Sequence, residues 1–493
     1  MRKKQAIIIG SGFGGLAIAI RLQARGYNTL VLEKNSTPGG HAGQLKKNGY
    51  TFDLGPSIVT EPEIIEDVFK IAGKKMSDYF ELIALDPFYK IFFHDKTSFD
   101  YSGDPIKMKL QLAKFSKADS QNYDKFMNYT SKLYKAVITE GLGSKPFYKI
   151  KDFLTFIPRI IWLRAFLPCY LTTTVFFRDF KTRFIFSFHT LFIGGNPFRA
   201  PGLFLMLPYL ERKKGVWFIK GGMYKLVEAF VQILREIGGD IKFNSEVNEI
   251  VVDAGKVSGV RVNEKFYPAD LVISNAHFAH TYKDLIPENK RRIWTDKKIL
   301  AKKYSMSCFL IYIGVKKQYP QFIHHTLILS QRYKELITDI FDRHILPEDF
   351  SMYLHIPTRT DPTMAPVGSD SMYLLIPVTN LLGEIDWNRE KERYANKIID
   401  FIETKFKLKD FRSSIEVLEL FTPLDFKEQR NNHLGAAWSL EPELFQIANF
   451  RPHNQSEEYK NLYLVGASTH PGGGLPGVLL GAEATEKLIL GST

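Results

Sequence analysis

Continuous apolar runs separated by a glycine-rich turn mark the first part of the chain. Residues 6–9 form a short apolar run, which is typical of a buried parallel strand. The turn Gly-Ser-Gly-Phe-Gly-Gly follows at 10–15, and residues 16–25 then have the composition of a helix ended by a glycine. A second apolar run at 29–32 leads directly to Glu33. The order strand, turn, helix, strand predicts an α/β fold.

The glycine spacing predicts a binding site for a dinucleotide. Gly10 permits a tight turn, Gly12 lets a pyrophosphate approach the backbone, and Gly15 lets the helix pack closely on the strand. The N-terminus of the helix offers free N–H groups to the phosphates. Glu33 lies where a carboxylate accepts hydrogen bonds from a ribose diol, which favours FAD or NAD over NADP. The predicted cofactor contacts of this unit are Gly10, Gly12, Phe13, Gly14, Gly15, Glu33 and Lys34.

Two further glycine-containing segments, 36–42 and 49–57, follow the second strand. Glycines here would let the backbone lie against a flat ring system without side-chain clashes. The alternative is that both segments are ordinary loops. The predicted cofactor contacts in them are Gly39, Gly40, His41, Gly55, Pro56 and Ser57.

With Pro38-Gly39-Gly40-His41 and residues 53–57 (Asp-Leu-Gly-Pro-Ser) behind the glycine turn, the sequence resembles the FAD-dependent carotenoid desaturases of the bacterial and fungal phytoene desaturase type. The resemblance covers nearly the whole chain. It recurs at residues 186–189, 194–198, 215–218, 221–223, 274–276, 324–326, 348–351, 450–454 and 462–478.

The resemblance implies a Rossmann-like FAD-binding domain assembled from discontinuous segments, a mixed α+β substrate domain and a helical membrane-associating region. The expected FAD-binding segments are residues 1–75, 216–290 and 456–493. Residues 76–215 would form the helical, membrane-associating and substrate region, and residues 291–455 the substrate domain. Further cofactor contacts implied by the resemblance are Val247, Asn275, Ala276, Gly466, Ala467, Gly477, Val478 and Leu479. Val247 matches the family position whose backbone meets the adenine, whereas His470 is expected to be structural.

The activity implied is the removal of hydrogen from adjacent carbons of phytoene or a related colourless polyene, with hydride transfer to FAD. Many relatives read G-A-G-T-H-P-G-A-G-I-P-G-V where this chain has small-for-small and aliphatic-for-aliphatic changes at 466–478. These changes leave the substrate and the number of desaturation steps open. The alternatives are another carotenoid-modifying flavoenzyme (a later-step desaturase, an isomerase or an oxidase) and a non-enzymatic lipid-binding escort of the same fold.

Composition agrees with a large globular protein and argues against some other classes. The chain has 493 residues, of which 45% are hydrophobic and 24% charged, which excludes disordered and collagenous proteins. Its two cysteines, Cys169 and Cys308, cannot form a disulfide framework and lack metal-ligand spacing. His324 and His325 lack the i, i+4 spacing of a helical metal pair, so no metal site is predicted.

Basic and aromatic residues are interleaved in one segment, 143–183. Eight basic and two acidic residues give it a net charge of +6, out of +13 for the whole chain, and ten aromatic residues lie among them. This composition favours an element that binds anionic lipids at a membrane surface. The alternative is an amphipathic helical domain packed on the core. Nucleic acid is discounted as a partner because no nucleic-acid-binding motif accompanies the segment.

Neither a signal peptide nor a transmembrane span is recognised, so we expect a cytoplasmic protein bound peripherally to the inner face of a membrane. The apolar run 203–210 is a plausible wall of a tunnel for the polyene, although core packing explains it equally well. Asp152, an isolated carboxylate in the basic and aromatic segment, is the candidate protein base; its alternative is an ordinary ion-paired surface residue. The sequence leaves the oligomeric state open.

Overall fold

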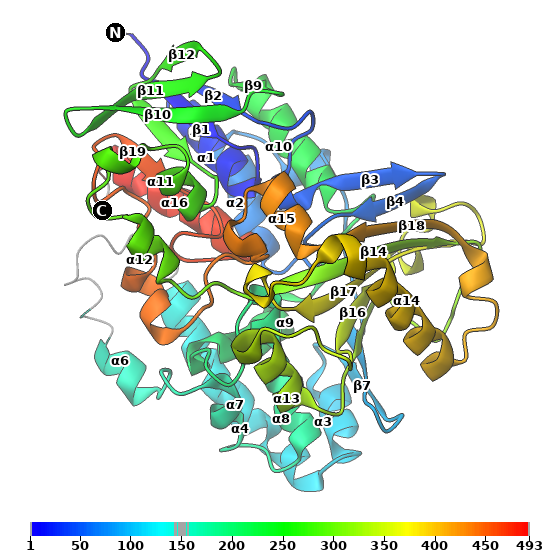
Figure 1. Cartoon of the computed structure of the whole chain (residues 1–493). Coiled ribbons are helices and arrows are strands. Elements are labelled where there is room, and N and C mark those ends of the chain that lie inside the picture. Colours follow the sequence, from blue (N-terminus) through cyan, green and yellow to red (C-terminus); the bar gives the residue numbers. More distant parts are fainter. Residues whose placement is uncertain (1, 142–144, 146–153, 155–156, 492–493) are drawn as a thin grey trace.

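The computed structural model describes residues 2–141, 145, 154 and 157–491. The predicted first strand is the centre of a parallel sheet at the top of Figure 1. In spatial order the five strands are β19 (Leu462–Leu464), β13 (Leu271–Ser274), β1 (Gln5–Ile9), β2 (Asn28–Leu32) and β9 (Asp240–Lys242). The sheet therefore takes strands from three distant parts of the chain, which confirms the predicted assembly of this layer from discontinuous segments.

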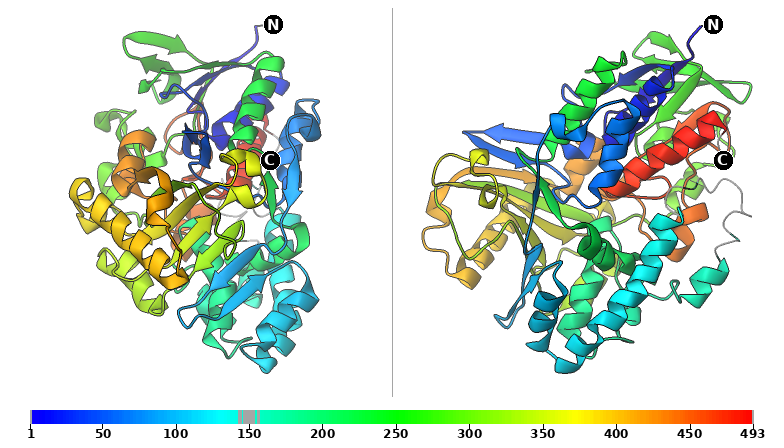
Figure 2. Two further views of the ribbon diagram at one scale, coloured as in Figure 1. Left: turned by 90° about the vertical axis from the view of Figure 1, so that its right-hand side faces the viewer. Right: turned by 180° about the vertical axis from the view of Figure 1, so that it is seen from behind.

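Helices α1 (Phe13–Ala24), α10 (Tyr224–Glu236) and α16 (Leu475–Leu490) pack together against this sheet. Figure 2 shows the C-terminal helix α16 beside the N-terminal helices when the molecule is seen from behind. The predicted helix over 16–25 begins three residues earlier, because the glycines at its start are themselves helical. The first and last helices of the chain are thus neighbours.

The described residues also form three smaller sheets. The segment near 250–260 forms an antiparallel hairpin, and a third strand extends it. The strands are β10 (Val247–Asp253), β11 (Lys256–Val262) and β12 (Lys265–Pro268). Two further two-stranded sheets pair β3 (Gln44–Lys47) with β4 (Tyr50–Asp53), and β5 (Leu82–Ala84) with β8 (Trp217–Ile219).

A seven-stranded sheet forms the second large layer, below the first in Figure 1. Its order is β18 (Ile415–Phe421), β14 (Ser307–Val315), β17 (Asp370–Val378), β16 (Met352–His355), β15 (His325–Ile328), β6 (Tyr89–Phe92) and β7 (Ser98–Tyr101). Side chains of β14 alternate between its faces. Phe309 and Ile311 pack in the same core as helix α14 (Trp387–Phe406), whereas Leu310 and Tyr312 belong to the core on the other face.

Helices form the lower part of the molecule in Figure 1. They are α3 (Pro105–Ala113), α4 (Lys117–Tyr134), α6 (Ile157–Trp162), α7 (Cys169–Thr173), α8 (Phe180–Ser187), α9 (Met206–Lys214) and α13 (Tyr333–Thr338). Other helices are α2 (Pro62–Ile71), α11 (Phe278–Lys283), α12 (Asp296–Leu300) and α15 (Pro423–Arg430).

The region 76–215, expected to be helical, in fact begins with strands β5, β6 and β7. Strand β6 pairs in parallel with β15, so this part of the region belongs to the seven-stranded sheet. Strand β6, with Tyr89 and Ile91 fully buried, pairs with its neighbour β7 on one edge and, on the other edge, with a strand more than two hundred residues away. Within the part of the chain that the structure describes, no helix has both the length and the apolar character needed to cross a membrane.

Candidate functional site

A cavity of about 520 Å³ lies where the two large sheets meet. One end is lined by the glycine turn after β1 and by the loop that precedes α16. The other walls come from the seven-stranded sheet and from α9, and they are mostly apolar. The glycine turn after β1 and the loop before α16 therefore border the same space as the seven-stranded sheet.

Two helix N-termini line this cavity. Helix α1 has Gly12 at its N-cap and α16 has Gly474, and neither cap carries a side-chain hydrogen bond. The first N–H groups of a helix have no partner within the helix, and the helix dipole adds a partial positive charge there. The two helix ends together can hold an anionic, elongated ligand.

The glycines of the turn are required by close packing. A Cβ atom on Gly15 would lie 2.2 Å from the carbonyl oxygen of Gly10, so the helix could not approach the strand. A Cβ on Gly14 would lie 2.7 Å from Oδ1 of Asn275, and one on Gly12 would lie 2.8 Å from Nδ2 of the same side chain. The structure thus brings Asn275, at the end of β13, into the glycine turn, and leaves room there for backbone alone.

Glu33 is held rigidly at the end of β2. Its side chain is buried, and one carboxylate oxygen accepts hydrogen bonds from the backbone N–H of Ser11 at 2.9 Å and from its hydroxyl at 2.6 Å. The other oxygen accepts from the backbone and side-chain nitrogens of Asn35 at 2.9 and 3.0 Å. Ser11 belongs to the glycine turn, so the carboxylate is fixed beside the turn as a ribose-binding role requires.

Cationic groups surround the same carboxylate. Removal from water lowers the pKa of Lys34 and of Arg430, while the charge of Glu33 opposes both shifts. The Nζ of Lys34 donates to Oδ1 of Asn431 at 2.7 Å. The segment before Val247 lies alongside, because the backbone N–H of Ser245 donates to the carbonyl of Glu33 at 2.8 Å.

His41 faces the cavity as a neutral imidazole. Removal from bulk water, and secondly the charge of Arg430, lower its pKa to about 4. Its Nε2 lies 3.0 Å from Nδ2 of Asn432, and its ring stacks on Phe426 with 5.8 Å between ring centroids. Behind it, a Cβ on Gly55 would lie 2.1 Å from the carbonyl oxygen of His41, so this second loop also needs glycine.

The predicted contact residues divide into two groups. Those lining the cavity are Gly12, Phe13, Gly14, Gly39, His41, Gly55, Pro56, Ser57, Asn275, Ala467, Gly477 and Val478. Those not among the lining residues are Gly10, Gly15, Glu33, Lys34, Gly40, Val247, Ala276, Gly466 and Leu479. Leu479 is fully buried in the core beneath α16, so its side chain has a packing role. The individual contacts with a cofactor remain predictions.

Arg451 was missed by the sequence analysis. Its buried guanidinium donates to the carbonyl oxygens of Thr469 at 3.0 Å and Ala467 at 2.6 Å, and burial lowers its pKa to about 10. It therefore fixes the loop that leads to α16. A lone arginine in the otherwise uncharged motif Phe450–Asn454 was the available signal. His470, in the same loop, is buried and lines the cavity, and burial lowers its pKa to about 3. The structural role expected for it stays a prediction.

The apolar walls include the run predicted as a tunnel wall. Five of its residues line the cavity: Leu203, Phe204, Met206, Leu207 and Leu210. Leu310 and Leu327 of the seven-stranded sheet also line it. The candidate base Asp152 lies outside the described residues. Among the described residues, two carboxylates line the cavity: Glu211, which pairs with His189 at 3.0 Å, and Glu61, whose pKa burial raises.

The glycine turn at residues 10–15, called the glycine cradle below, follows a strand of the parallel sheet and borders an apolar cavity. This arrangement is typical of dinucleotide-binding oxidoreductases of the flavoprotein class. The family model for flavin-containing amine oxidoreductases matches residues 13–488, and the chain belongs to that family. FAD is the cofactor of this protein, and the backbone-only cradle and the two uncapped helix N-termini fit its phosphates and ring.

Curated relatives narrow the family further. The chain is 40% identical to phytoene desaturase (lycopene-forming) of Pseudescherichia vulneris, over 99% of each chain. It is 39% identical to phytoene desaturase (neurosporene-forming) of Rhodobacter capsulatus, over 98% of this chain and 94% of that one. It therefore belongs to the carotenoid desaturase branch of the family, as its sequence predicted.

Solved structures confirm the fold. Putrescine oxidase bound to putrescine has a TM-score of 0.68 at 10% identity and covers 99% of both chains. The CLA-producing fatty acid isomerase from P. acnes has a TM-score of 0.64 at 13% identity, with 99% of this chain and 98% of that chain covered.

Proposed function

We propose that this protein is an FAD-dependent desaturase that introduces conjugated double bonds into phytoene or a closely related apolar polyene. One observation carries the proposal: the flavin-binding loops and the apolar walls belong to the same cavity. A substrate without polar groups can therefore lie directly against the cofactor. Bound FAD supplies the hydride acceptor.

The chain's own residues would bind, orient and shield the reactants. The N-terminus of α1 would bind the phosphates, and the N-terminus of α16 would stabilise negative charge on the ring. Leu207, Leu310 and Leu327 would hold the hydrocarbon in place and exclude water from it. Asp152 stays the proposed proton acceptor on sequence grounds. If Asp152→Asn left desaturation intact, it would lose that role.

Expression in a host that accumulates phytoene tests the activity. We expect coloured products whose absorption maxima report the number of conjugated double bonds, and purified protein that is yellow and releases FAD. Another carotenoid-modifying flavoenzyme would leave phytoene unchanged but convert a later polyene. An escort of the same fold would be purified colourless and would change no pigment.

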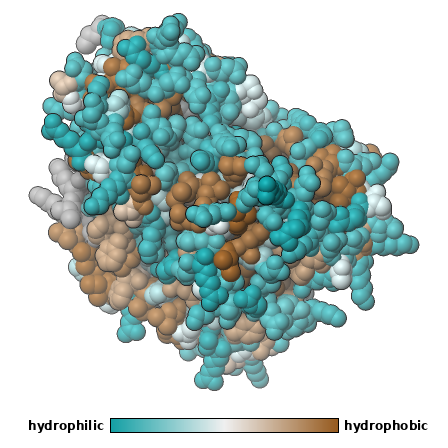
Figure 3. Space-filling view, viewed as in Figure 1, coloured by the Kyte–Doolittle hydropathy of each residue, from teal (hydrophilic) through white to brown (hydrophobic). Residues whose placement is uncertain are grey.

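We also propose that the protein binds the cytoplasmic face of a membrane through the region 157–180. Large apolar side chains are exposed there, among them Trp162 at 69% and Val175 at 70%. Exposed Arg164 and Arg178 lie in the same region. Figure 3 shows apolar surface at the lower left, on the side where Figure 1 places α6. The arginines of such a surface can bind anionic lipid headgroups, while its apolar side chains enter the apolar layer beneath them.

Co-sedimentation with vesicles tests this surface. Binding to vesicles containing phosphatidylglycerol should exceed binding to neutral vesicles, and salt should weaken it. The double variant Trp162→Ser/Val175→Ser should bind more weakly, while Val367→Ser, at an exposed residue elsewhere, should bind as the wild type does. Equal binding of all three proteins, or none at any ionic strength, would count against the proposal.

A further inference from the structure

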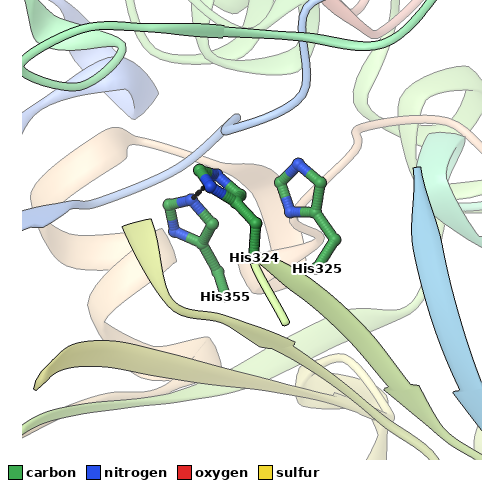
Figure 4. A group of neighbouring side chains, drawn as sticks. All are labelled: His324, His325 and His355. Carbon is green, nitrogen blue, oxygen red and sulfur yellow. Dashed lines mark hydrogen bonds between the residues drawn. The ribbon is translucent and has the colours of Figure 1, made fainter. Parts of the chain in front are cut away.

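Three histidines meet on the seven-stranded sheet. His325 begins β15 and His355 ends β16, and the antiparallel register sets these two residues directly opposite each other. His324 precedes β15 and turns its ring toward His355 (Figure 4). One ring nitrogen from each histidine lies within 4.8 Å of the others.

All three imidazoles are shielded from water. His325 and His355 are fully buried, and His324 is 5% exposed. An imidazole binds a metal ion through the lone pair of one ring nitrogen while the other nitrogen carries the proton.

Two of the rings have a hydrogen bond at Nδ1, which leaves Nε2 as the nitrogen that can bind a metal ion. Nδ1 of His324 lies 2.6 Å from the hydroxyl of Thr360, and Nδ1 of His325 lies 2.6 Å from the hydroxyl of Tyr353. If both Nδ1 atoms donate, Nε2 of His325 keeps a free lone pair, and the lone pair on Nε2 of His324 accepts the hydrogen bond from His355. Metal-bound histidines are typically oriented in this way by a partner on the other ring nitrogen.

The protein leaves one ring nitrogen of His325 and one of His355 without a hydrogen-bond partner. These atoms are Nε2 of His325 and Nδ1 of His355, and both are buried. A buried polar atom left unpaired destabilises the folded protein. Nε2 of His324 and Nε2 of His355 form a hydrogen bond at 3.1 Å. This distance is close to the spacing of about 3.3 Å between two nitrogens bound at about 2.0 Å to a tetrahedral ion, so an ion could replace the proton that the two rings share.

We propose that His324, His325 and His355 bind one divalent transition-metal ion such as Zn²⁺. Three histidines with a fourth position left for water are an established coordination of zinc. A ligand set of imidazoles alone favours zinc over magnesium or calcium, which prefer oxygen. The ion would join β15 and β16 behind Tyr353, whose ring lines the cavity, and so would brace that wall.

Zinc titration of the purified, flavin-loaded protein tests the site. A chelator first removes bound metal, and zinc is then added back. We expect mass spectrometry to find about one zinc ion bound per chain, and the added zinc to raise the Tm. His325→Gln and His355→Gln should each lower the zinc affinity by roughly 100-fold or more, and Thr360→Val by roughly 10-fold. His94→Gln, at a histidine outside the cluster, should bind zinc as the wild type does.

X-ray absorption at the zinc edge keeps the test decisive even if a variant fails to fold. The wild-type protein should show a shell of nitrogen with imidazole scattering at about 2.0–2.1 Å. Any one of three results would overturn the proposal. The wild type could bind less than one-tenth of an equivalent of zinc, the glutamine variants could bind zinc as tightly as the wild type, or the absorption spectrum could show no imidazole around the zinc.

Discussion

At the scale of single residues, the protonation of Asp53 makes the free energy of unfolding depend on pH. It ends β4 with its side chain buried, and one oxygen accepts the backbone N–H of Met223 at 2.9 Å. Its other oxygen has no hydrogen-bond partner, and burial raises its pKa to about 7. The folded protein therefore keeps a proton, between about pH 4 and pH 7, that the unfolded chain releases.

A rise in pH through that window should lower the free energy of unfolding. Between pH 5 and pH 8 the wild type should lose about 3 kcal/mol more than Asp53→Asn, which has no proton to release. Urea unfolding at several pH values measures the difference. Asp78→Asn, at an exposed aspartate, should keep the wild-type pH dependence; the same dependence in Asp53→Asn would contradict the assignment.

Glu33 should control the affinity for FAD. Glu33→Gln keeps the shape of the side chain but removes the charge that strengthens hydrogen bonds to a ribose, each worth about 1.5–3 kcal/mol. We expect the Kd for FAD, measured by fluorescence titration of the apoprotein, to rise by roughly 10- to 100-fold. Glu264→Gln, on the exposed turn between β11 and β12, is the matched control. An unchanged Kd in Glu33→Gln would remove Glu33 from the ribose site.

Residues that act through local geometry could be predicted from the sequence. The spacing of Gly10, Gly12 and Gly15 and the position of Glu33 specify one turn and the end of one strand, and the structure places them together. Arg451 and His355 could not be predicted in the same way. Each acquires its role from partners brought in by tertiary packing, at the loop before α16 and across the β15–β16 pair.

At the scale of elements, the same distinction separates β1 from β6. Strand β1 is a continuous apolar run, so side chains on both of its faces must be buried, and the pattern alone predicts a central parallel strand. Strand β6 has four residues and alternates, and its parallel partner β15 begins at His325. A short pattern of this kind does not specify which sheet it joins.

The start of α16 depends on one close contact. A Cβ on Gly477 would lie 2.7 Å from the carbonyl oxygen of Gly472, whereas the nearest neighbour to a Cβ on Gly473 is the Ala467 side chain at 3.8 Å. Both glycines line the cavity, and neither needs a positive φ. Alanine substitutions at the two positions can therefore be compared. The comparison distinguishes crowding at the start of the helix from the effect of adding a methyl group anywhere in the loop.

Gly477→Ala should displace the N-terminus of α16 and lower the free energy of unfolding by about 1–3 kcal/mol. Gly473→Ala should change it by no more than about 0.5 kcal/mol. Chemical denaturation of both apoproteins measures these values without interference from bound flavin. Equal stability of the two variants would show that the helix start tolerates the extra methyl group.

At the scale of the whole molecule, the site exists because distant segments close on one space. The glycine turn near the N-terminus and the loop before the last helix form the flavin end, and the seven-stranded sheet and α9 form the apolar end. On the proposed function, a polyene that gains several double bonds must move along this cavity between reactions. The free length of the cavity then limits how many double bonds are introduced.

Leu207→Trp tests this limit, because it adds an aromatic ring to the apolar wall formed by α9, which is separate from the glycine cradle. The polyene should then advance less far, and the pigments formed in a phytoene-accumulating host should shift toward shorter conjugation and shorter absorption wavelengths. Val367→Trp, at a fully exposed residue, should give wild-type pigments. Flavin content should stay the same in both variants, because neither residue belongs to the cradle. If Leu207→Trp kept its flavin and made wild-type pigments, α9 would not border the path of the polyene.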